Sequence, residues 1–326
     1  MSLCEAAALT SPNMIARHPT VNDIAKAATR IAPYLTPTPI VKASFKNSWL
    51  KLENLQETGA YKVRGALNAL ACQIERGDRR PVVAASAGNH ALGVAWAARK
   101  LGLFANVVVP ATAPQTKIDG ARSLGATVII KGETFEHAFE HAMESAMVND
   151  WRFLHAFDDA EIIAGQGTIA LELLHFAPDT VLIPIGGGGL ASGVGLVLKA
   201  HGIRAWGVQV ENVDGMGRKL DGKGPVQPAQ TLADGLRVFE PGRLTAEICS
   251  TVLDGVLRVT EDRVKSTVLT LARKSRLVVE GAGATAPAAL DMIPGKKKLA
   301  LVSGGNIDLI TLNKLIGPAK YLNQAL

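Results

Sequence analysis

The stretch Asn54-Leu-Gln-Glu-Thr-Gly-Ala-Tyr-Lys-Val-Arg-Gly-Ala66 places one lysine, Lys62, behind a Thr58-Gly59 turn and at the mouth of a predicted helix over residues 63–74. Burial among apolar neighbours lowers the pKa of such a lysine, which makes its amine a better nucleophile and base, and suits it to form a Schiff base. A lysine at a helix start is more often simply solvated, so the meaning of Lys62 depends on the motifs that follow.

The composition is that of a globular protein with a large core. The chain has 326 residues, of which 48% are hydrophobic and 20% charged, and this length fits one or two domains. The net charge is +6, but the basic residues are scattered, with one tight run at 296–298. A nucleic-acid-binding protein usually presents a basic stripe. We therefore predict no nucleic-acid partner, and an anionic cofactor or substrate explains the charge equally well.

The cysteines and the first residues bear on the compartment. Cys4, Cys72 and Cys249 are far apart and form no Cys-x-x-Cys pair, which argues against disulfides or a zinc site and favours a reducing cytoplasm. Residues 1–13 lack the charge and apolar run of a signal peptide, and we expect them to be disordered. No apolar run approaches the roughly 18 residues of a membrane helix. The sequence thus predicts a cytoplasmic protein without membrane contact.

Short apolar strands alternate with helices along most of the chain. A helix is expected to start at residues 20–23, and short strands lie within residues 40–51. Further strands are predicted at 82–85, 105–110, 127–130, 180–185, 204–210, 256–259 and 298–302. Further helices are predicted at 90–100, 114–124, 134–149, 169–176, 190–200, 245–252 and 260–273. Gly165 to Thr168 are expected to precede the helix at 169–176, and residues 214–234 to form a loop.

Repeated strand–helix units with apolar strands imply parallel sheets with helices on both faces. We predict an α/β fold of two open, mostly parallel, twisted sheets around a cleft. Residues 72–157 form a self-contained series and are predicted to be a smaller, inserted domain. Residues 1–71 and 158–326 are then the large domain.

Three turns that follow predicted strands carry candidate binding groups: Gly186 to Gly189, Ser86 to His90, and Ser303 to Asn306. Glycines between a strand and a helix let backbone N–H groups surround a phosphate. The glycine run lacks the Gly-Lys-Ser/Thr of an ATP-binding loop and the Gly-x-Gly-x-x-Gly spacing of NAD-binding folds, so both ligands are poor candidates. The two serine turns could bind a carboxylate or a flat ligand, although such turns often have no further role.

Together and in this order, Lys62 and the three turns resemble one family, the pyridoxal-phosphate enzymes of the tryptophan-synthase-β type, also called fold type II. The resemblance runs from about Val21 to Ile310 and is strongest to the threonine/serine dehydratases. Residues 209–216 and 280–284 are most similar to the short, catabolic-type threonine dehydratases. The resemblance implies pyridoxal 5′-phosphate as cofactor, an active site in the cleft between a large and a small domain, and a homodimer or homotetramer.

The resemblance also implies a role for each motif residue. Lys62 would hold the cofactor covalently and carry the Cα proton of the substrate. The other cofactor-binding residues would be Tyr61, Asn89, Gly186, Gly187, Gly188, Gly189, Leu190, Gly235 and Ser303, and the substrate carboxylate would be bound by Ser86, Ala87, Asn89 and His90. Tyr61 stands where the family usually has phenylalanine. The neutral hydroxyl of Ser303 beside the ring nitrogen suits β-elimination better than amino transfer.

The implied reaction is the dehydration and deamination of L-threonine to 2-oxobutyrate and ammonia, and of L-serine to pyruvate. Similar serine racemases carry a second serine where this chain has Ala87, and their cation ligands match Gln209 and Gly215. We therefore predict neither racemisation nor a metal site, although the nearby carboxylates of Glu211 and Asp214 remain candidates for binding a cation. Another hydroxy amino acid such as 3-hydroxyaspartate remains an alternative substrate. A β-replacement synthase remains an alternative activity, but these enzymes typically have Thr-Ser-Gly-Asn at residues 86–89.

Overall fold

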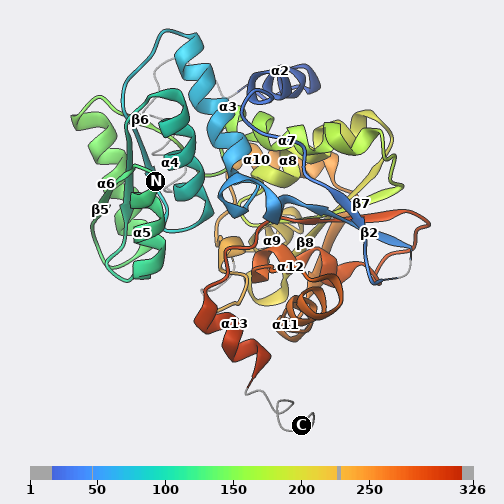
Figure 1. Ribbon diagram of the computed structural model, residues 1–326. Coiled ribbons are helices and arrows are strands. Elements are labelled where there is room, and N and C mark those ends of the chain that lie inside the picture. Colours follow the sequence, from blue (N-terminus) through green and yellow to red (C-terminus); the bar gives the residue numbers. More distant parts are fainter. Residues whose placement is uncertain (1–16, 46, 226–228, 318–326) are drawn as a thin grey trace.

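The computed structural model describes residues 17–45, 47–225 and 229–317, and these form a six-stranded sheet and a four-stranded sheet, here called the large and the small sheet. Figure 1 shows the small sheet with its helices beside the large one. The predicted α/β fold with two mostly parallel sheets is confirmed. The prediction for residues 1–13 lies outside the described ranges.

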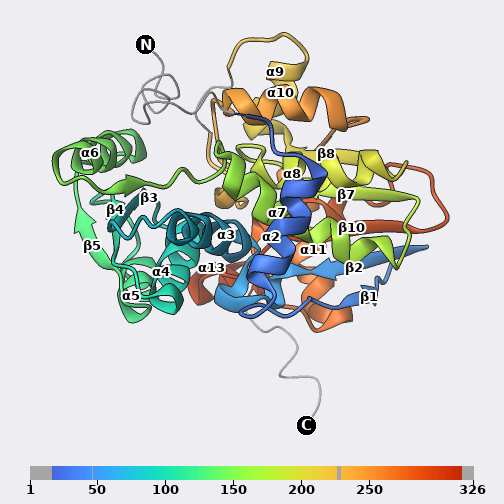
Figure 2. The same cartoon turned by 90° about the horizontal axis from the view of Figure 1, so that it is seen from above.

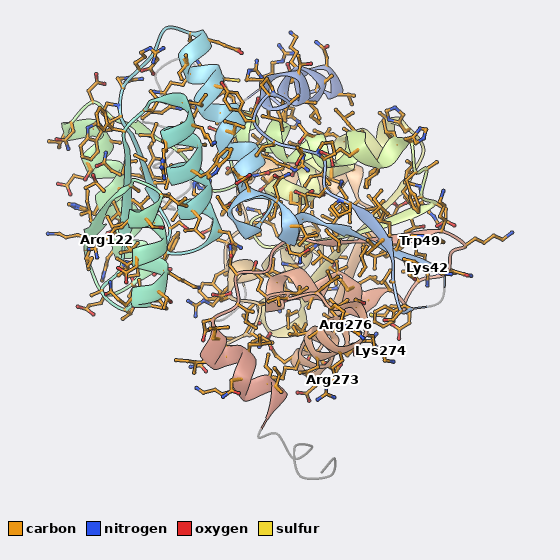
Figure 3. All side chains as sticks on the ribbon, in the orientation of Figure 1. Lys42, Trp49, Arg122, Arg273, Lys274 and Arg276 are labelled. Atoms are coloured by element: carbon orange, nitrogen blue, oxygen red, sulfur yellow. The ribbon has the colours of Figure 1, made fainter. Side chains whose placement is uncertain are left out.

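The large sheet has the order β1-β2-β10-β7-β8-β9, and all its neighbours are parallel except β1 and β2. Its strands are β1 (Ile40–Lys42), β2 (Ser48–Leu52), β7 (Thr180–Pro184), β8 (Arg204–Val210), β9 (Gly255–Val259) and β10 (Lys298–Val302). Figure 3 labels Lys42 and Trp49 on the antiparallel edge. The exposed Lys42 on this edge strand disfavours pairing with another chain.

Helices cover both faces of the large sheet, as Figure 1 shows. In β10, Leu299 and Leu301 join one apolar cluster, while Ala300 and Val302 join the other, because side chains alternate along a strand. The first face carries α2 (Val21–Ile31), α7 (Ala160–Leu174), α8 (Gly189–Ala200) and α10 (Arg243–Val252). The second carries α11 (Glu261–Thr270), α12 (Gly281–Thr285) and α13 (Leu309–Ile316). Both faces of the strands are thus buried, which explains their unbroken apolar runs.

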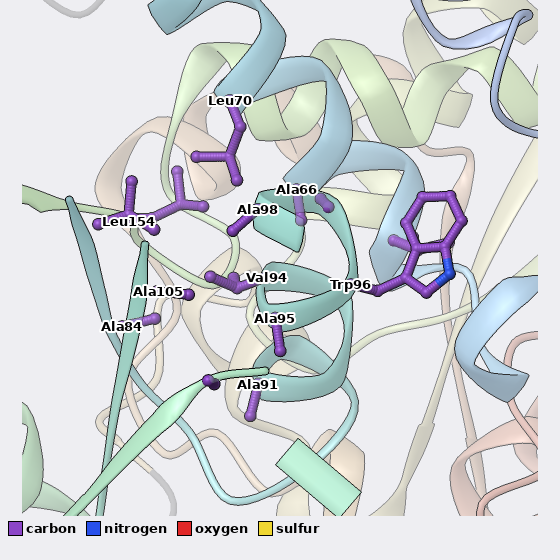
Figure 4. Close-up of a cluster of buried hydrophobic side chains, with 14 of the residues drawn as sticks. Ala66, Leu70, Ala84, Ala91, Val94, Ala95, Trp96, Ala98, Ala105 and Leu154 are labelled. Atoms are coloured by element: carbon purple, nitrogen blue, oxygen red, sulfur yellow. The ribbon is translucent and has the colours of Figure 1, made fainter. Parts of the chain in front are cut away.

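The small sheet is parallel throughout and has the order β5-β4-β3-β6. Its strands are β3 (Val82–Ala85), β4 (Ala105–Val109), β5 (Thr127–Ile130) and β6 (Arg152–Phe153). Its helices are α3 (Lys62–Glu75), α4 (Asn89–Leu101) and α5 (Gln115–Ser123) on one side and α6 (Phe135–Val148) on the other. Figure 2 shows this separation, and Figure 4 shows Leu70 of α3 and Val94 of α4 in the shared core.

Helix α3 links the two sheets, because it contacts both α4 and α7. Gly65 and Gly165 make the second contact possible. A Cβ on Gly165 would lie 2.6 Å from the carbonyl oxygen of Arg64, and one on Gly65 would lie 2.3 Å from the Gln166 side chain. The chain therefore needs glycine at both positions for this packing. The domain boundaries at residues 72 and 157 stay a proposal.

Most predicted elements match the structure, and four strands coincide with it in both ends: 82–85, 127–130, 204–210 and 298–302. The predicted start at 20–23 is confirmed by α2, where Asp23 N donates to Thr20 Oγ1 at 3.2 Å and Thr20 N donates to Asp23 Oδ2 at 2.8 Å. The loop predicted at 214–234 is wrong in part. It contains the short helix α9 (Gly215–Leu220), whose backbone Gly217 N is held by the buried Gln209 at 2.7 Å.

The predicted helix at 169–176 is also wrong at its start, because α7 begins at Ala160. Asp159 caps it by accepting hydrogen bonds from Glu161 N at 2.7 Å and Ile162 N at 2.9 Å. Gly167 lies inside the helix, where a Cβ would meet the carbonyl oxygen of Gly193 at 2.8 Å. Close packing on α8, and not a turn, explains this glycine. Among the described helices, none is both long and apolar enough to cross a bilayer.

Candidate active site

The turn before Lys62 directs the lysine toward the space between the sheets. Thr58 (φ 65°) and Gly59 (φ 72°) are both left-handed, and a Cβ on Gly59 would lie 2.5 Å from Asn306 Oδ1. Glycine is therefore required at residue 59, both for its backbone conformation and for the close approach of Asn306. Helix α3 then begins at Lys62 itself.

Backbone contacts fix the lysine segment to the end of β10. Ala60 forms an antiparallel bridge with Gly304, and Tyr61 N donates to the carbonyl oxygen of Ser303 at 3.1 Å. Ser303 itself is only 3% exposed. Since Lys62 follows directly, its position relative to Ser303 is set by main-chain hydrogen bonds and not by flexible side chains.

All the residues predicted for the site line one cavity of about 960 Å³. They are Tyr61, Lys62, Ser86, Ala87, Asn89, His90, Gly186, Gly187, Gly188, Gly189, Leu190, Gly235 and Ser303. The three turns follow β3, β7 and β10, so the cavity lies at the carboxyl ends of parallel strands from both sheets. Ligands of open α/β folds bind at this end of the strands.

The Lys62 amine is poised for reaction near neutral pH. Its Nζ donates a hydrogen bond to the carbonyl oxygen of Ala156 at 2.8 Å and lies 5.5 Å from the centre of the Tyr61 ring. Burial lowers the pKa of Lys62 to about 8, because the low-dielectric surroundings disfavour the charged form. A substantial fraction of this amine is therefore neutral and nucleophilic at physiological pH.

The four glycines form a cradle that leaves no room for side chains. Gly188 has φ 97° and caps α8, and a Cβ there would lie 2.6 Å from Met216 Cε. A Cβ on Gly187 would lie 2.3 Å from the ring of Phe157. Thr245 Oγ1 donates to the carbonyl oxygen of Gly187 at 2.7 Å and holds the loop. The N-terminus of α8 and the glycine backbone that lines the cavity fit a phosphate group.

His155 fixes Phe157 beneath this cradle. The backbone N–H groups of Phe157 and Asp158 donate to His155 Nδ1 at 3.2 and 2.8 Å, and the His155 and Phe157 rings meet edge to face with centroids 4.5 Å apart. Burial lowers the pKa of His155 to about 4, so the ring is neutral and accepts both bonds. Sequence reasoning gave His155 no role.

The turn after β3, at residues 86–90, is held by hydrogen bonds within the turn and to the backbone nearby. Gly88 N donates to Ser86 Oγ at 3.1 Å. His90 is 3% exposed, and its Nε2 lies 3.1 Å from the carbonyl oxygen of Leu154. Within the described residues its buried Nδ1 has no hydrogen-bond partner. Burial, with the nearby charge of Lys62, lowers the pKa of His90 to about 3, and the ring is neutral.

Glu280 is a site residue that sequence reasoning mentioned only as part of a motif. It lines the cavity, is 6% exposed, and accepts a hydrogen bond from Asn89 Nδ2 at 2.7 Å. Asn306 Nδ2 in turn donates to Asn89 Oδ1 at 2.8 Å. Asn89 therefore contacts the large-sheet half at two points. An acid directly before the small residues of α12 was the available signal.

Two of the residues considered for a cation, Asp214 and Gln209, have other partners. Asp214 Oδ2 accepts a hydrogen bond from Arg258 Nε at 2.6 Å, and Gln209 is buried and bonded to Gly217 N. Across the described ranges, no group of three or more His, Cys, Asp and Glu side chains is placed to hold a metal ion.

Comparison with known proteins gives the same family as the motifs. The sequence pattern of the family described as "Pyridoxal-phosphate dependent enzyme" matches residues 31–305. The chain is 43% identical to the L-threonine ammonia-lyase of Thermotoga maritima over 82% of this chain and 69% of that one. It is 37% identical to the catabolic L-threonine dehydratase TdcB of Staphylococcus aureus over 91% of both.

A solved structure gives a second comparison. The structure of maize serine racemase matches with a TM-score of 0.85 and 32% identity, and the match covers 91% of this chain and 96% of that one. The fold and the sequence therefore agree: the chain belongs to the pyridoxal-phosphate dependent enzymes.

Proposed function

We propose that this protein deaminates L-threonine to 2-oxobutyrate and ammonia, and L-serine to pyruvate, by pyridoxal-phosphate-dependent β-elimination. The observation that carries the proposal is the convergence of Lys62, the glycine cradle, the Ser86–His90 turn and Ser303 on one cavity. The relatives named as threonine ammonia-lyase and threonine dehydratase, at 43% and 37% identity, support this substrate.

The glycine cradle and Lys62 fit the cofactor. We propose that backbone groups of Gly186 to Gly189 bind its phosphate, that Ser303 faces its ring nitrogen, and that Asn89 contacts its ring hydroxyl. When bound, pyridoxal phosphate supplies an electron sink that stabilises negative charge at the substrate Cα. A hydroxyl at Ser303 leaves the ring nitrogen without a counter-charge, which moderates that sink.

The protein's own groups then bind the substrate and move its proton. Backbone N–H groups and the Ser86 hydroxyl of the turn before α4 orient the substrate carboxylate. Lys62, with a pKa lowered to about 8 by burial, takes the Cα proton as its neutral amine. The Cα–H electron pair then forms the Cα–Cβ double bond, while the β-hydroxyl takes the proton held by Lys62 and leaves as water. The released enamine hydrolyses to the 2-oxo acid and ammonia.

Serine racemisation is the second candidate, because a serine racemase has a closely similar fold. Racemisation needs a proton donor on the face of Cα opposite Lys62. Ala87 lines the cavity in the turn where the resemblance places that group, and its methyl side chain cannot donate a proton. We therefore propose elimination without racemisation.

Assembly and compartment are part of the same proposal. We propose a homodimer or homotetramer in the cytoplasm, with an amino acid as the small-molecule partner. The widely spaced cysteines support the compartment. Cys249 is buried, and burial raises the pKa of its thiol to about 12, so it is inert.

The direct test is to incubate the purified protein with the amino acid alone, without an added nucleophile, and to measure the products. The purified protein should release equal amounts of ammonia and 2-oxobutyrate from L-threonine, and L-serine should yield pyruvate but no D-serine. Ammonia release only when a thiol is supplied would instead identify a β-replacement enzyme. Activity on 3-hydroxyaspartate with none on L-threonine would support the β-elimination reaction but contradict L-threonine as its substrate.

The glycine cradle gives a second prediction. Gly187→Ala adds a methyl 2.3 Å from the Phe157 ring, and overpacking of this kind costs about 1–3 kcal/mol. If this cost falls on the cofactor-bound state, the Kd for pyridoxal phosphate, measured by titration of the protein freed of cofactor, should rise about 5- to 150-fold. Gly224→Ala is the matched control, because a Cβ at that position meets nothing within 4 Å. Equal affinities for the two variants would contradict the assigned cradle.

A further inference from the structure

An ion pair joins the two halves of the molecule at the solvent-exposed edge of the cavity. Lys117 lies on α5 in the small-sheet half, and α5 packs on α4 and β5. Asp234 is the first residue of the 3₁₀ turn η4 (Asp234–Leu236) in the large-sheet half, and η4 packs on α12. Lys117 Nζ donates to Asp234 Oδ2 at 2.6 Å, and the side chains are 33% and 51% exposed. An ion pair this exposed contributes little to stability. Its position at the cavity suggests another role.

Glu280 lies directly behind this ion pair. A second cavity of about 60 Å³ is lined by Lys117, Asp234 and Glu280 together with Asn89. The carboxyl of Glu280 is confined on its other side, since a Cβ on Gly304 would lie 2.2 Å from Glu280 Oε1. The Glu280 side chain thus shares this small cavity with the ion pair, and the Asn89 amide donates a hydrogen bond to it.

We propose that Lys117 and Asp234 form a clasp across the cavity that acts through Glu280. Their opposite charges set whether Glu280 is ionised, and Glu280 in turn positions Asn89. An ionised carboxylate accepts a stronger hydrogen bond from the Asn89 amide than a neutral carboxyl does. Lys117 and Asp234 are therefore positioning residues. This role goes beyond the proposed function and does not depend on which amino acid is the substrate.

The charges around Glu280 support the clasp. The pKa of Glu280 is raised to about 7. Burial and the charge of Asp234 raise it, while the Asn89 hydrogen bond, the charge of Lys117 and a hydrogen bond from the Asn306 backbone lower it. Tyr61 faces Glu280 from the start of α3, and burial, with the charge of Glu280, raises the pKa of the Tyr61 phenol. The other titratable groups of the cavity wall are Lys62, His90, Glu133, Glu136, His155, Arg237 and Glu240.

The raised pKa of Glu280 makes its state measurable through stability. In the folded protein Glu280 binds a proton at pH values where the unfolded chain, near its ordinary 4.5, has lost it. Its contribution to stability is therefore full below that ordinary value and is lost as the pH rises through about 7. The difference in Tm between the wild type and Glu280→Gln should follow this curve.

The clasp is tested by measuring this Tm difference from about pH 5 to about pH 9 in three backgrounds. In the protein as purified, its midpoint should lie between the ordinary pKa of 4.5 and the folded-state pKa of about 7, and the difference should level off above about pH 7. Lys117→Met leaves Asp234 facing Glu280, so the midpoint should move to higher pH. Asp234→Asn leaves Lys117, so it should move to lower pH. If the ion pair only links the two halves mechanically, Lys117→Met and Asp234→Asn should change the midpoint in the same way.

Two further variants keep the test specific. Lys117→Arg retains the charge and should keep the wild-type midpoint. Arg122→Met removes a cation from the same helix and should leave the midpoint unchanged. Arg122 pairs with Asp119 at 3.6 Å, and Figure 3 labels it at the outer edge of the molecule. Shifts of the same sign in the two clasp variants, or no Glu280-dependent step, would overturn the proposal. The readout needs no substrate, so it stands apart from the test of function.

Discussion

Replacing Lys62 with alanine is expected to lower kcat for ammonia release from L-threonine by about 10²- to 10⁴-fold or more, since a positioned proton-transfer group contributes about that much. Lys62 is the amine that meets the glycine cradle and Ser303 in one cavity, with a pKa lowered to about 8. The variant should also lose any visible absorption band that comes from covalently held cofactor. Initial rates of ammonia and 2-oxobutyrate formation, together with the spectrum, measure both effects.

The control for this variant is Lys42→Ala on the exposed edge strand β1, labelled in Figure 3. It removes the same charge far from the cavity and should keep full activity and the absorption band. Lys62→Ala itself should remain folded, because it removes an amine whose charged form is penalised by burial. A folded Lys62→Ala protein with activity within tenfold of the wild type would contradict the assigned base.

The fold could be predicted where local sequence and tertiary packing agree. The strand Val82–Ala85 consists of apolar residues that are buried on both faces, so a short apolar run bounded by turns marks both of its ends. The start of α7 could not be predicted from its glycines. Gly165 and Gly167 are typical of a turn, but here they allow α3 and α8 to approach the helix. The cap at Asp159 followed by Glu161 was the better local signal.

The candidate site could be predicted because its motifs each follow a strand of a parallel sheet. The carboxyl ends of parallel strands lie at one edge of a sheet. If both sheets face one cleft, the turns that begin at residues 86 and 186 both lie at that cleft, and in the structure both line the same cavity. Contacts across that cleft could not be predicted. Lys117 and Asp234 are 117 residues apart, and Lys117 lies outside every predicted motif. Only the packing of the two halves brings them together.

The lysine helix depends on a buried ion network next to it, centred on Arg64. Arg64 is 2% exposed and donates to both carboxylate oxygens of Glu53, at 2.7 and 2.8 Å, and to Glu172 at 2.6 Å. Lys51, which is also buried, pairs with Glu172. The network contains two cations and two carboxylates, so its charges balance. It joins α3 to α7 and to the strand β2.

Arg64→Met should therefore destabilise the protein by about 3–5 kcal/mol, because it leaves the buried carboxylate of Glu53 without its cationic partner. Urea unfolding measures this as a lower midpoint at unchanged slope. Arg80→Met is the control, since Arg80 pairs with Asp78 and Asp150 at 46% exposure, and it should cost at most about 1 kcal/mol.

The double variant Arg64→Met with Glu53→Met separates two explanations of that loss. If the cost comes from an unpaired buried charge, removing both charges should recover much of the stability, as replacing a whole buried pair by apolar side chains often does. If the double variant is as unstable as Arg64→Met, the packing and hydrogen bonds of the guanidinium carry the stability instead. Since Arg64 is two residues from Lys62 on the same helix, either result also identifies the interaction that anchors the first turn of α3.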